Sequence, residues 1–380
     1  MRTLGFVIGA FAIGLGLEFG LGAVISDGSV RNLIMLAACN VIVALSLNVI
    51  NGMAGQFSIG HAGFMGIGAY TSAVIACNLH EKLGGGEPTF ARSFIIVPVA
   101  LLSAGLVSAI FGFVVGLPSL RLRGDYLAIV TLGFAEIVRL LIATAQVTEQ
   151  GETAAAAFAH VHGPSSLFHA LGVSISSLGG QNGYSGPNHE GVQLYAGPFW
   201  VFGIMLLVVV AAWRLKFSGW GRALRALRED EIAAAAVGVD PTRYKVTSFV
   251  ISALGGGIAG GLMAQMRDGS YVVNPEDFNF QTSFNAITMV ILGGSGSVSG
   301  AVLGSFFVTF TVKAIELLQN TSVAQAIRGP HHFGEGIDIT VDLNALRMIL
   351  YASVLVSLMV WRPEGVFGER EIGSKKRGSA

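Results

Sequence analysis

The chain is dominated by long apolar runs separated by short polar segments. A helix needs about 20 apolar residues to cross a bilayer, because every backbone N–H and C=O must be paired within the segment. The pattern therefore predicts an all-α fold, a polytopic membrane helix bundle of about ten spans. One run, 284–294, is too short to cross alone, so it either recruits part of the preceding segment or forms a half-helix. The runs are residues 4–25, 31–50, 57–79, 94–117, 125–146, 197–214, 246–266, 284–294, 300–318 and 344–361.

The first apolar run invites a second interpretation, as a secretory signal peptide. It extends from Met1-Arg2 to Ile25, which is longer than the usual apolar region of about 7–15 residues, and it lacks a clear small-x-small cleavage site. We therefore interpret it as the first span.

Basic residues indicate how the spans are oriented. With the N-terminus placed in the cytoplasm, fifteen Lys and Arg residues fall in inner loops and six in outer ones, as the positive-inside rule requires. Both termini are then cytoplasmic, and the long loop 147–196 faces outward. We divide the chain into a transmembrane permease domain, 1–366, with a large cytoplasmic loop at 215–245, and a basic cytoplasmic tail, 367–380.

Composition agrees with a membrane protein. Only 12% of the residues are charged, against about a quarter in soluble domains. The formal net charge is zero, so no overall field favours nucleic acid. Glycine is abundant, with 52 residues, and small residues let membrane helices approach closely. Glycines four residues apart are interpreted first as packing devices and second as pathway lining: Gly112/Gly116, Gly256/Gly260, Gly257/Gly261 and Gly300/Gly304.

The loop 215–245 is long enough to contain structure of its own. Residues 221–237 are rich in strong helix formers, and they predict one short helix that stops at Gly238. Asp240-Pro241 then supplies an N-cap and a first-turn proline for the next helix. Such a helix could be solvated or lie on anionic lipid. Charges of both signs around a patch of small residues favour docking into a groove of another protein.

Polar residues within apolar runs need a reason, because burying them in lipid is unfavourable. Glycine interruptions occur at 52–68 and 293–304, one in each half, as in transporters with an internal repeat. Around the first interruption lies a polar group that could simply form interhelical hydrogen bonds. The more specific hypothesis is that it lines a solute pathway. Its members are Asn48, Asn51, Gln56, Ser58 and His61.

Four ionisable residues lie inside predicted spans at a spacing of three. Glu136 with Arg139, and Lys313 with Glu316, can each form a local structural ion pair. The histidines of the outer loops match no familiar metal-ligand spacing, and Cys39 and Cys77 are interpreted as buried small hydrophobic residues. We therefore expect no metal site, no cofactor and no catalytic group, and we do not expect an enzyme.

Six stretches, in order along the chain, carry a resemblance that extends over nearly its whole length. They are NVINGMAGQFSIGHAGFMGIGAY (48–70), LRLRGDYLAIVTLGFAEIVRL (120–140), GGQNGYSGP (179–187), GRALRALREDEIAAAAVGVDPTRYK (221–245), FNFQTSFNAITMVILGGSGSVSGAVLG (278–304) and WRPEGVFG (361–368). These stretches resemble the LivM-type permease subunits of branched-chain amino-acid ABC transporters.

The resemblance implies an inner-membrane permease that forms the pathway for hydrophobic amino acids. The implied partners are a second homologous permease subunit, two ATP-binding subunits and a periplasmic amino-acid-binding protein. A separate ATPase agrees with the absence of a P-loop, since no lysine is followed by Ser or Thr. The 215–245 loop would dock on that ATPase through Arg222, Arg225, Arg228, Glu229, Asp230, Glu231, Ala234 and Gly238.

Two other functions remain open at this point. Permeases of the related urea and amide ABC branch share the same architecture. A secondary transporter that uses Glu18, Glu136 or Glu316 as an ion site is a further alternative.

Overall fold

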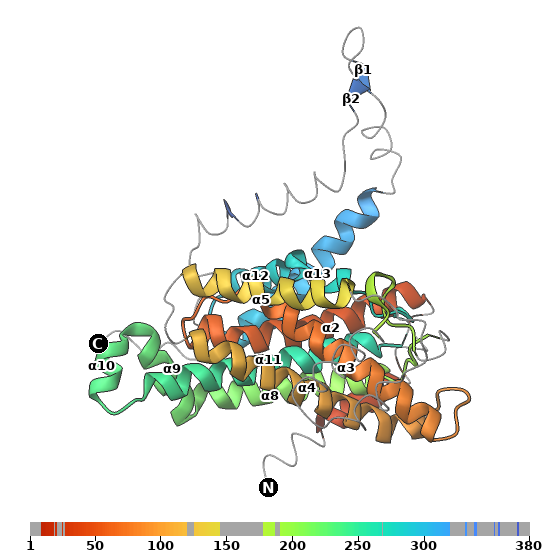
Figure 1. The fold of residues 1–380 in the computed structure, drawn as a ribbon, viewed down its shortest axis with the longest axis horizontal. Helices are drawn as coiled ribbons and strands as arrows, with labels where there is room; N and C mark the ends of the chain where they lie inside the picture. Colours follow the sequence, from red (N-terminus) through yellow and green to blue (C-terminus); the bar gives the residue numbers. More distant parts are fainter. Residues whose placement is uncertain are drawn as a thin grey trace, which may run out of the picture.

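In the computed structural model, helices lie side by side in one bundle (Figure 1). The described residues are 9–18, 20, 25, 27–119, 125–144, 178–186, 191–267, 269–319, 331–332, 338–339, 353, 356–357 and 371. The long helices are α2 (Gly28–Asn48), α3 (His61–Lys82), α4 (Phe90–Ser119), α5 (Asp125–Ala143), α8 (Pro198–Phe217), α11 (Pro241–Ala264), α12 (Phe280–Gly293) and α13 (Val298–Gln319).

Eight of the ten apolar runs coincide with these helices. Among the described residues, six helices are long and apolar enough to cross a membrane: α2 with its extension to Met53, α3, α4, α5, α8 and α11. A shorter apolar helix, Gly9–Glu18, occupies part of the first run. The doubtful run 284–294 belongs to α12, which begins at Phe280 and has 14 residues, too few to cross alone. The run 344–361 lies almost wholly outside the described residues.

The remaining elements are short. They are η1 (Val49–Met53), η2 (Gly180–Asn182), α9 (Gly219–Glu229), α10 (Glu231–Ala236), η3 (Pro275–Phe278), β1 (His331–His332) and β2 (Asp338–Ile339). The two strands pair with each other, antiparallel.

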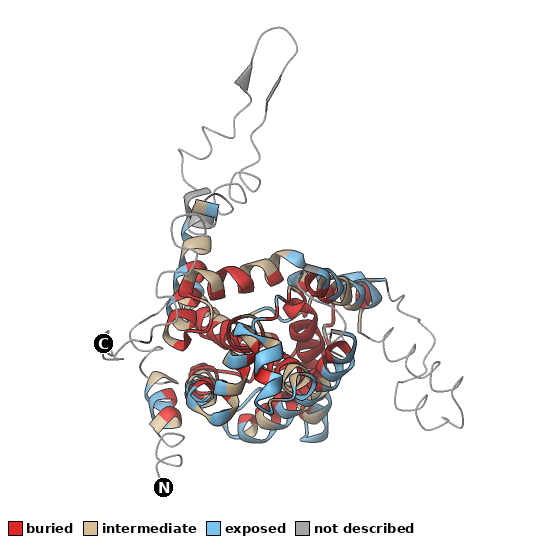
Figure 2. Cartoon of the chain, turned by 90° about the vertical axis from the view of Figure 1, so that its left-hand side faces the viewer, coloured by how far each residue is buried: buried red, intermediate tan, exposed pale blue. Residues whose placement is uncertain are grey.

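The centre of the bundle is built on small residues of α11. A methyl group on Gly260 would overlap the Met65 carbonyl oxygen of α3, and one on Gly112 of α4 would overlap Ala253. The helices are therefore in backbone contact, as the packing interpretation of the glycine pairs requires. Buried residues fill the middle of the bundle, and exposed ones surround it (Figure 2).

The outer surfaces of α4 and α5 are apolar. Leu102 and Ile110 on α4 and Ile129 on α5 are each more than 60% exposed. Aliphatic side chains exposed along whole helices are suited to hydrocarbon rather than water.

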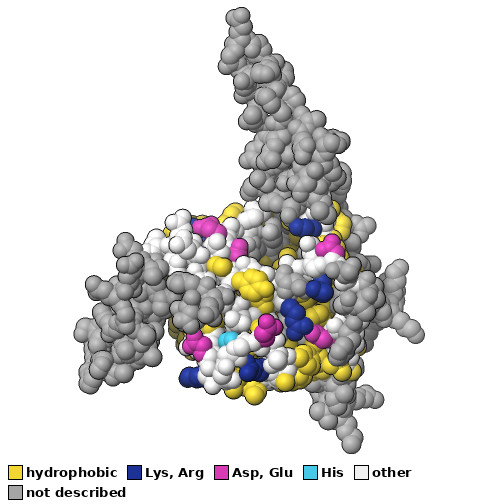
Figure 3. Space-filling model, turned by 90° about the vertical axis from the view of Figure 1, so that its right-hand side faces the viewer, with side chains coloured by type: hydrophobic (Ala, Val, Ile, Leu, Met, Phe, Trp, Pro, Cys, Tyr) yellow, Lys and Arg dark blue, Asp and Glu magenta, His cyan; other side chains and the backbone are white. Residues whose placement is uncertain are grey.

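The two ends of the bundle differ in structure. Helices α9 and α10 project from one end, and residues 178–186 and 191–197 with the α3–α4 connection lie at the other (Figure 1). Charged side chains of both signs lie at that second end (Figure 3). There Glu18 accepts a hydrogen bond from the Phe199 N–H, 3.0 Å, and forms an ion pair with Arg267, 2.5 Å. Tyr184 of the GGQNGYSGP stretch pairs with Val273.

Candidate coupling site

The projecting segment is shaped by a series of helix caps. The Ser218 hydroxyl accepts from the Gly221 N–H and starts α9, and the Asp240 carboxylate accepts from the Arg243 N–H and starts α11. Between them, Gly238 has a φ of +90°, and its neighbour Val239 donates to the Ala234 carbonyl. This left-handed residue ends α10, as predicted for Gly238.

The expectation of one helix over 221–237 is wrong, because the segment breaks at Asp230. This residue is extended, with φ −153° and ψ 114°. Its carboxylate accepts from the N–H groups of Ile232, 2.8 Å, and Ala233, 3.0 Å. An N-cap bond satisfies backbone donors that a continuous helix would use otherwise, which favours a new start over continuation.

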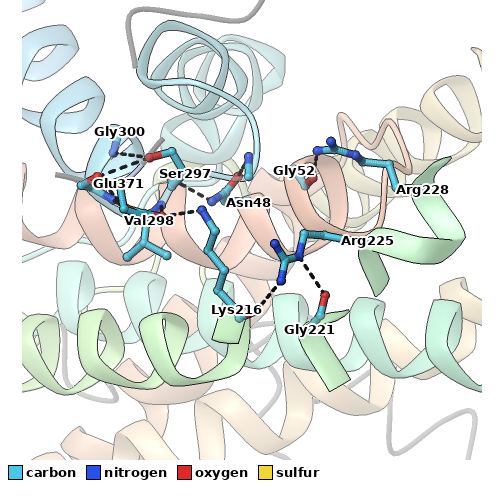
Figure 4. A network of polar contacts seen from close by, with 12 residues as sticks. Asn48, Gly52, Lys216, Gly221, Arg225, Arg228, Ser297, Val298, Gly300 and Glu371 are labelled. Carbon is cyan, nitrogen blue, oxygen red and sulfur yellow. Dashed lines mark hydrogen bonds and ion pairs between the residues drawn. The ribbon is translucent and has the colours of Figure 1, made fainter. Parts of the chain in front are cut away.

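One face of α9 is attached to the bundle. Leu224 and Leu227 are buried. Arg225 donates to the carbonyls of Gly221 and Lys216, at 3.4 and 3.3 Å, within the segment itself (Figure 4). Two of the arginines predicted to face an ATPase, Arg225 and Arg228, thus contact their own chain.

The opposite face, and most of α10, is exposed. Ile232 and Val237 are 82% and 80% exposed, and they flank the buried Ala234. Arg222, Glu229 and Asp230, three further residues of the predicted docking set, are also exposed. Glu231 instead forms an ion pair with Lys245 of α11, 2.7 Å, which ties α10 to the bundle.

Beneath α9, two interruptions of the bundle meet. Helix α2 continues into the π-helical turn η1 and then into an irregular stretch before α3 begins at His61. The second interruption is the turn 294–297 between α12 and α13. Asn48 joins them, because its oxygen accepts from the Gly296 N–H, 2.8 Å, and its amide donates to the Ser297 carbonyl, 3.1 Å (Figure 4).

Arg228 connects α9 to both interruptions. Its Nη1 donates to the Gly52 carbonyl, 2.8 Å, and its methylene groups cover Gly55, where an added Cβ would overlap Arg228 Cγ. Gly55 has a φ of +67° and Gly296 of +85°, conformations that a larger residue adopts only at a cost. We call Asn48, Gly52, Gly55, Arg228, Gly296 and Ser297 the coupling junction.

A second connection from the α8–α9 corner runs through Glu371. Its carboxylate forms a buried ion pair with Lys216 at the end of α8, 2.5 Å. It also accepts from the N–H groups of Val298 and Ser299 at the start of α13, 2.8 and 2.9 Å. Burial opposes ionisation, but Lys216, the Ser299 hydroxyl and the two N–H groups outweigh it, so the pKa of Glu371 is held below its usual value.

Nothing in the sequence singled out Glu371, which belongs to the basic tail 367–380. The rest of that tail lies outside the described residues.

The polar group predicted to line a pathway is largely buried within the chain. Asn48, Gln56, Ser58 and His61 are buried. Asn51 and Ser58 bond each other reciprocally across the loop, at 3.1 and 3.2 Å. These bonds hold the interruption in shape, and a role in lining the pathway stays a prediction.

His61 starts α3 within the same group. The ring of His61 bonds the Ser46 hydroxyl, 2.8 Å, and the following N–H, of Ala62, donates to Ser283 of α12, 3.0 Å.

Of the two local ion pairs, one has both partners described. Arg139 Nε donates to Glu136, 3.0 Å, and the guanidinium reaches Glu276 of η3, 2.5 Å, so it also links two elements. The side chain of Glu316 lies outside the described residues, whereas Lys313 borders a cavity between helices. The outer-loop histidines His160, His162, His169 and His189 are likewise outside the described residues.

Comparison with known proteins identifies the family of this chain. A family model described as the permease component of branched-chain amino-acid transport systems matches residues 29–358. The chain belongs to this family. It is 36% identical to the high-affinity branched-chain amino-acid transport permease LivM of Salmonella typhimurium over 349 residues, 90% of this chain and 70% of that protein.

More distant relatives include both permease types of this family. The probable LivM of Methanocaldococcus jannaschii is 27% identical, covering 87% of this chain and 91% of that protein. The LivH permease of Salmonella typhimurium is 22% identical, covering 90% and 95%. No solved structure matches.

Proposed function

We propose that this chain is one of two permease subunits of an ABC importer and forms part of the transmembrane pathway for branched-chain amino acids. It would work with a second homologous permease, two ATP-binding subunits and an amino-acid-binding protein in the bacterial inner membrane. The proposal includes about ten spans and cytoplasmic termini, which place α9 and α10 in the cytoplasm. Family membership and the identity to LivM support the substrate class.

The observation that carries the proposal is the two-sided character of the α9–α10 segment. Its outer side presents the exposed side chains of Ile232 and Val237 at the end of the bundle. Burying such a side chain stabilises a complex by about 2 kcal/mol. Its inner side is bonded to the coupling junction through Arg228. A partner bound to α10 would therefore move the α9–α10 segment, which contacts both interruptions.

This geometry suggests how ATP hydrolysis elsewhere could act on the bundle. Displacement of α9 pulls on the Gly52 carbonyl through Arg228, and Gly52 follows Asn48 in the same turn. Asn48 in turn holds the start of α13 through Ser297. Because α2 ends and α13 begins at irregular turns, the tilt of the two helices can change without breaking helical hydrogen bonds.

The test is to replace Ile232 and Val237 together by serine in the complete transporter. Loss of two buried aliphatic contacts weakens docking by about 3–4 kcal/mol, or several hundredfold. We expect the ATP-binding subunits to dissociate on purification, with ATP-driven leucine uptake lost in proteoliposomes. Tyr126→Ser is the matched control, because Tyr126 is also apolar and 70% exposed but lies on α5.

Three results would contradict the proposal. Retained ATPase subunits and normal uptake in the double variant would remove the docking argument. Uptake by the isolated chain without ATP would indicate the secondary transporter. Binding of urea or an amide, but not leucine, by the cognate binding protein would indicate the other ABC branch.

A further inference from the structure

Charged side chains of α5 and η3 lie well inside the depth of a predicted span. Helix α5 is apolar enough to cross a membrane from Tyr126 to Ala143. Glu136 lies about 15 Å from the first of these residues and about 10 Å from the last, at 1.5 Å per residue. Arg139 pairs with Glu136 and, at 2.5 Å, with Glu276 of η3. Glu276 is therefore held at the same depth.

The backbone at η3 is irregular at this depth as well. An added Cβ on Gly66 of α3 would lie 3.3 Å from Phe278, the last residue of η3. Gly66 is about 24 Å along α3 from the end of that helix at Lys82. Helix α12 therefore begins deep in the bundle, where the Asn279 side chain caps it. Within a bilayer, irregular backbone is tolerated only where protein buries it or where it lines water.

The chain leaves these charged groups open on one side. The Glu276 side chain is 56% exposed and that of Glu136 is 38% exposed, whereas that of Arg139 is 16% exposed. Asp277, the next residue of η3, is also exposed. We call these four residues the α5–η3 edge. Three carboxylates share one guanidinium there, and ionised side chains at this depth must face protein or water. Lipid therefore does not suit this edge.

Helix α4 shows how a lipid-facing surface of the same chain differs. From Phe94 to Leu117, every exposed residue of α4 is apolar. Leu102, near the middle of the helix, is 65% exposed, so it is about as open as Glu276. The two surfaces are thus equally uncovered by the chain itself, but only that of α4 is suited to hydrocarbon.

We propose that the α5–η3 edge lines the water-filled passage for the solute, and that the second homologous permease closes this passage from the other side. The inference rests on the proposed function, in which the second permease is the other subunit embedded in the membrane. Because the edge is open in this chain alone, another membrane subunit must keep lipid away from the water that reaches it. The apolar side chain of Ile137, next to Glu136, then packs against that partner, and α4 faces lipid.

The first experiment measures water access in the complete transporter in liposomes. Asp277→Cys and the matched control Leu102→Cys are treated with charged methanethiosulfonates, one cationic and one anionic, so that attraction by nearby carboxylates is recognised. Only the thiolate reacts, and apolar surroundings suppress it. With both reagents, Asp277→Cys should react at least about tenfold faster, the effect of one pKa unit on the thiolate fraction. Wild type gives a low background because Cys39 and Cys77 are buried.

The second experiment identifies what lies opposite the edge, and it leaves the charged residues unchanged. Ile137, which is 58% exposed, is replaced by the photoreactive amino acid p-benzoylphenylalanine in the complete transporter. Irradiation should join this chain covalently to the second permease. Ile110 of α4, 63% exposed, is the matched control position, and the same replacement there should give little of that product.

The outcomes separate this inference from the proposed function. If wild-type transporter takes up no leucine, the proposed function fails. If wild type is active, but Asp277→Cys reacts no faster than Leu102→Cys, or Ile137 gives no more cross-linked permease than Ile110, the edge does not face the passage and the permease assignment stands.

Leucine uptake after labelling tests whether the water reached is the path of the solute. Full modification of Asp277→Cys places a bulky charged group in the passage and should lower uptake at least about tenfold relative to the unmodified variant, as one unit of 1.4 kcal/mol would. Unimpaired uptake would show that the solute does not pass this edge.

Discussion

The contact between Arg228 and the Gly52 carbonyl provides a direct test of the coupling junction. Arg228→Met keeps an unbranched apolar stem over Gly55 but removes the guanidinium donors, one of which lies 2.8 Å from the Gly52 oxygen. Arg214→Met is the matched control, because Arg214 is an exposed arginine near the end of α8 and lies outside the predicted docking set. Both variants lose one positive charge, so any difference between them reflects where the lost side chain lies and not the loss of charge itself.

The magnitude follows from the geometry. A hydrogen bond with one charged partner contributes about 1.5–3 kcal/mol when shielded. The Arg228 side chain is 22% exposed, so we take the lower part of that range, about 1.5 kcal/mol. If the bond transmits the displacement of α9, its loss reduces the coupling free energy by that amount, which corresponds to about tenfold.

The assay measures leucine transported per ATP hydrolysed by the complete transporter in proteoliposomes. We expect Arg228→Met to lower this ratio about tenfold while ATP hydrolysis itself stays within about twofold of wild type. Arg214→Met should retain a ratio near wild type. Equal ratios for the two variants, or a wild-type ratio in Arg228→Met, would refute the argument that force passes through this contact.

Three further predictions concern folding of the chain. Asn48→Ala leaves the buried Gly296 N–H without its partner, at about 1–3 kcal/mol, and should lower the melting temperature in detergent by several degrees; an unchanged value would show that water replaces the amide. Gly260→Ala places a methyl group against the α3 backbone and should reduce the yield of monodisperse protein severalfold on size exclusion, whereas Gly133→Ala, which meets nothing within 4 Å, should not. Glu371→Gln breaks a buried ion pair and should destabilise the chain by about 3 kcal/mol at neutral pH. Because the pKa of Glu371 is lowered on folding, the difference in unfolding free energy between wild type and variant should be constant above pH 4.5, the ordinary pKa. This free-energy difference should shrink as the pH falls below that value. Thermal melts across pH 3–8 test both expectations.

Much of the fold could be predicted because the bilayer constrains local sequence strongly. Some apolar runs are longer than the apolar stretch of a typical soluble helix. These runs predicted the positions of α2, α3, α4, α5, α8 and α11 within a few residues at most ends. Helix caps could also be predicted from the sequence, because the Asp240-Pro241 N-terminal cap and the Gly238 C-terminal cap act only on neighbouring backbone groups. Errors arose where two local signals competed, as at Asp230, where good helix formers on both sides concealed an N-cap in the middle.

The roles of polar residues could not be read in the same way. The sequence located a polar group around 48–61, but whether it faced a pathway or the protein depended on partners as distant as Ser297 and Ser283. The pair of Glu136 and Arg139 was predicted from its spacing, but its third member, Glu276, was found only when the fold placed η3 beside α5.

By itself, the sequence determined a helical membrane bundle, its main apolar helices, the presence of helical structure in the loop 215–245 and the family. These depend on hydrophobicity, caps and blocks of residues that act over a few positions. Only the tertiary structure decided that Arg228 faces its own bundle, that Glu371 holds α8 to α13, and that Glu276 meets Arg139. Those features depend on groups tens to hundreds of residues apart, and their energies exist only once the chain brings them within hydrogen-bonding distance.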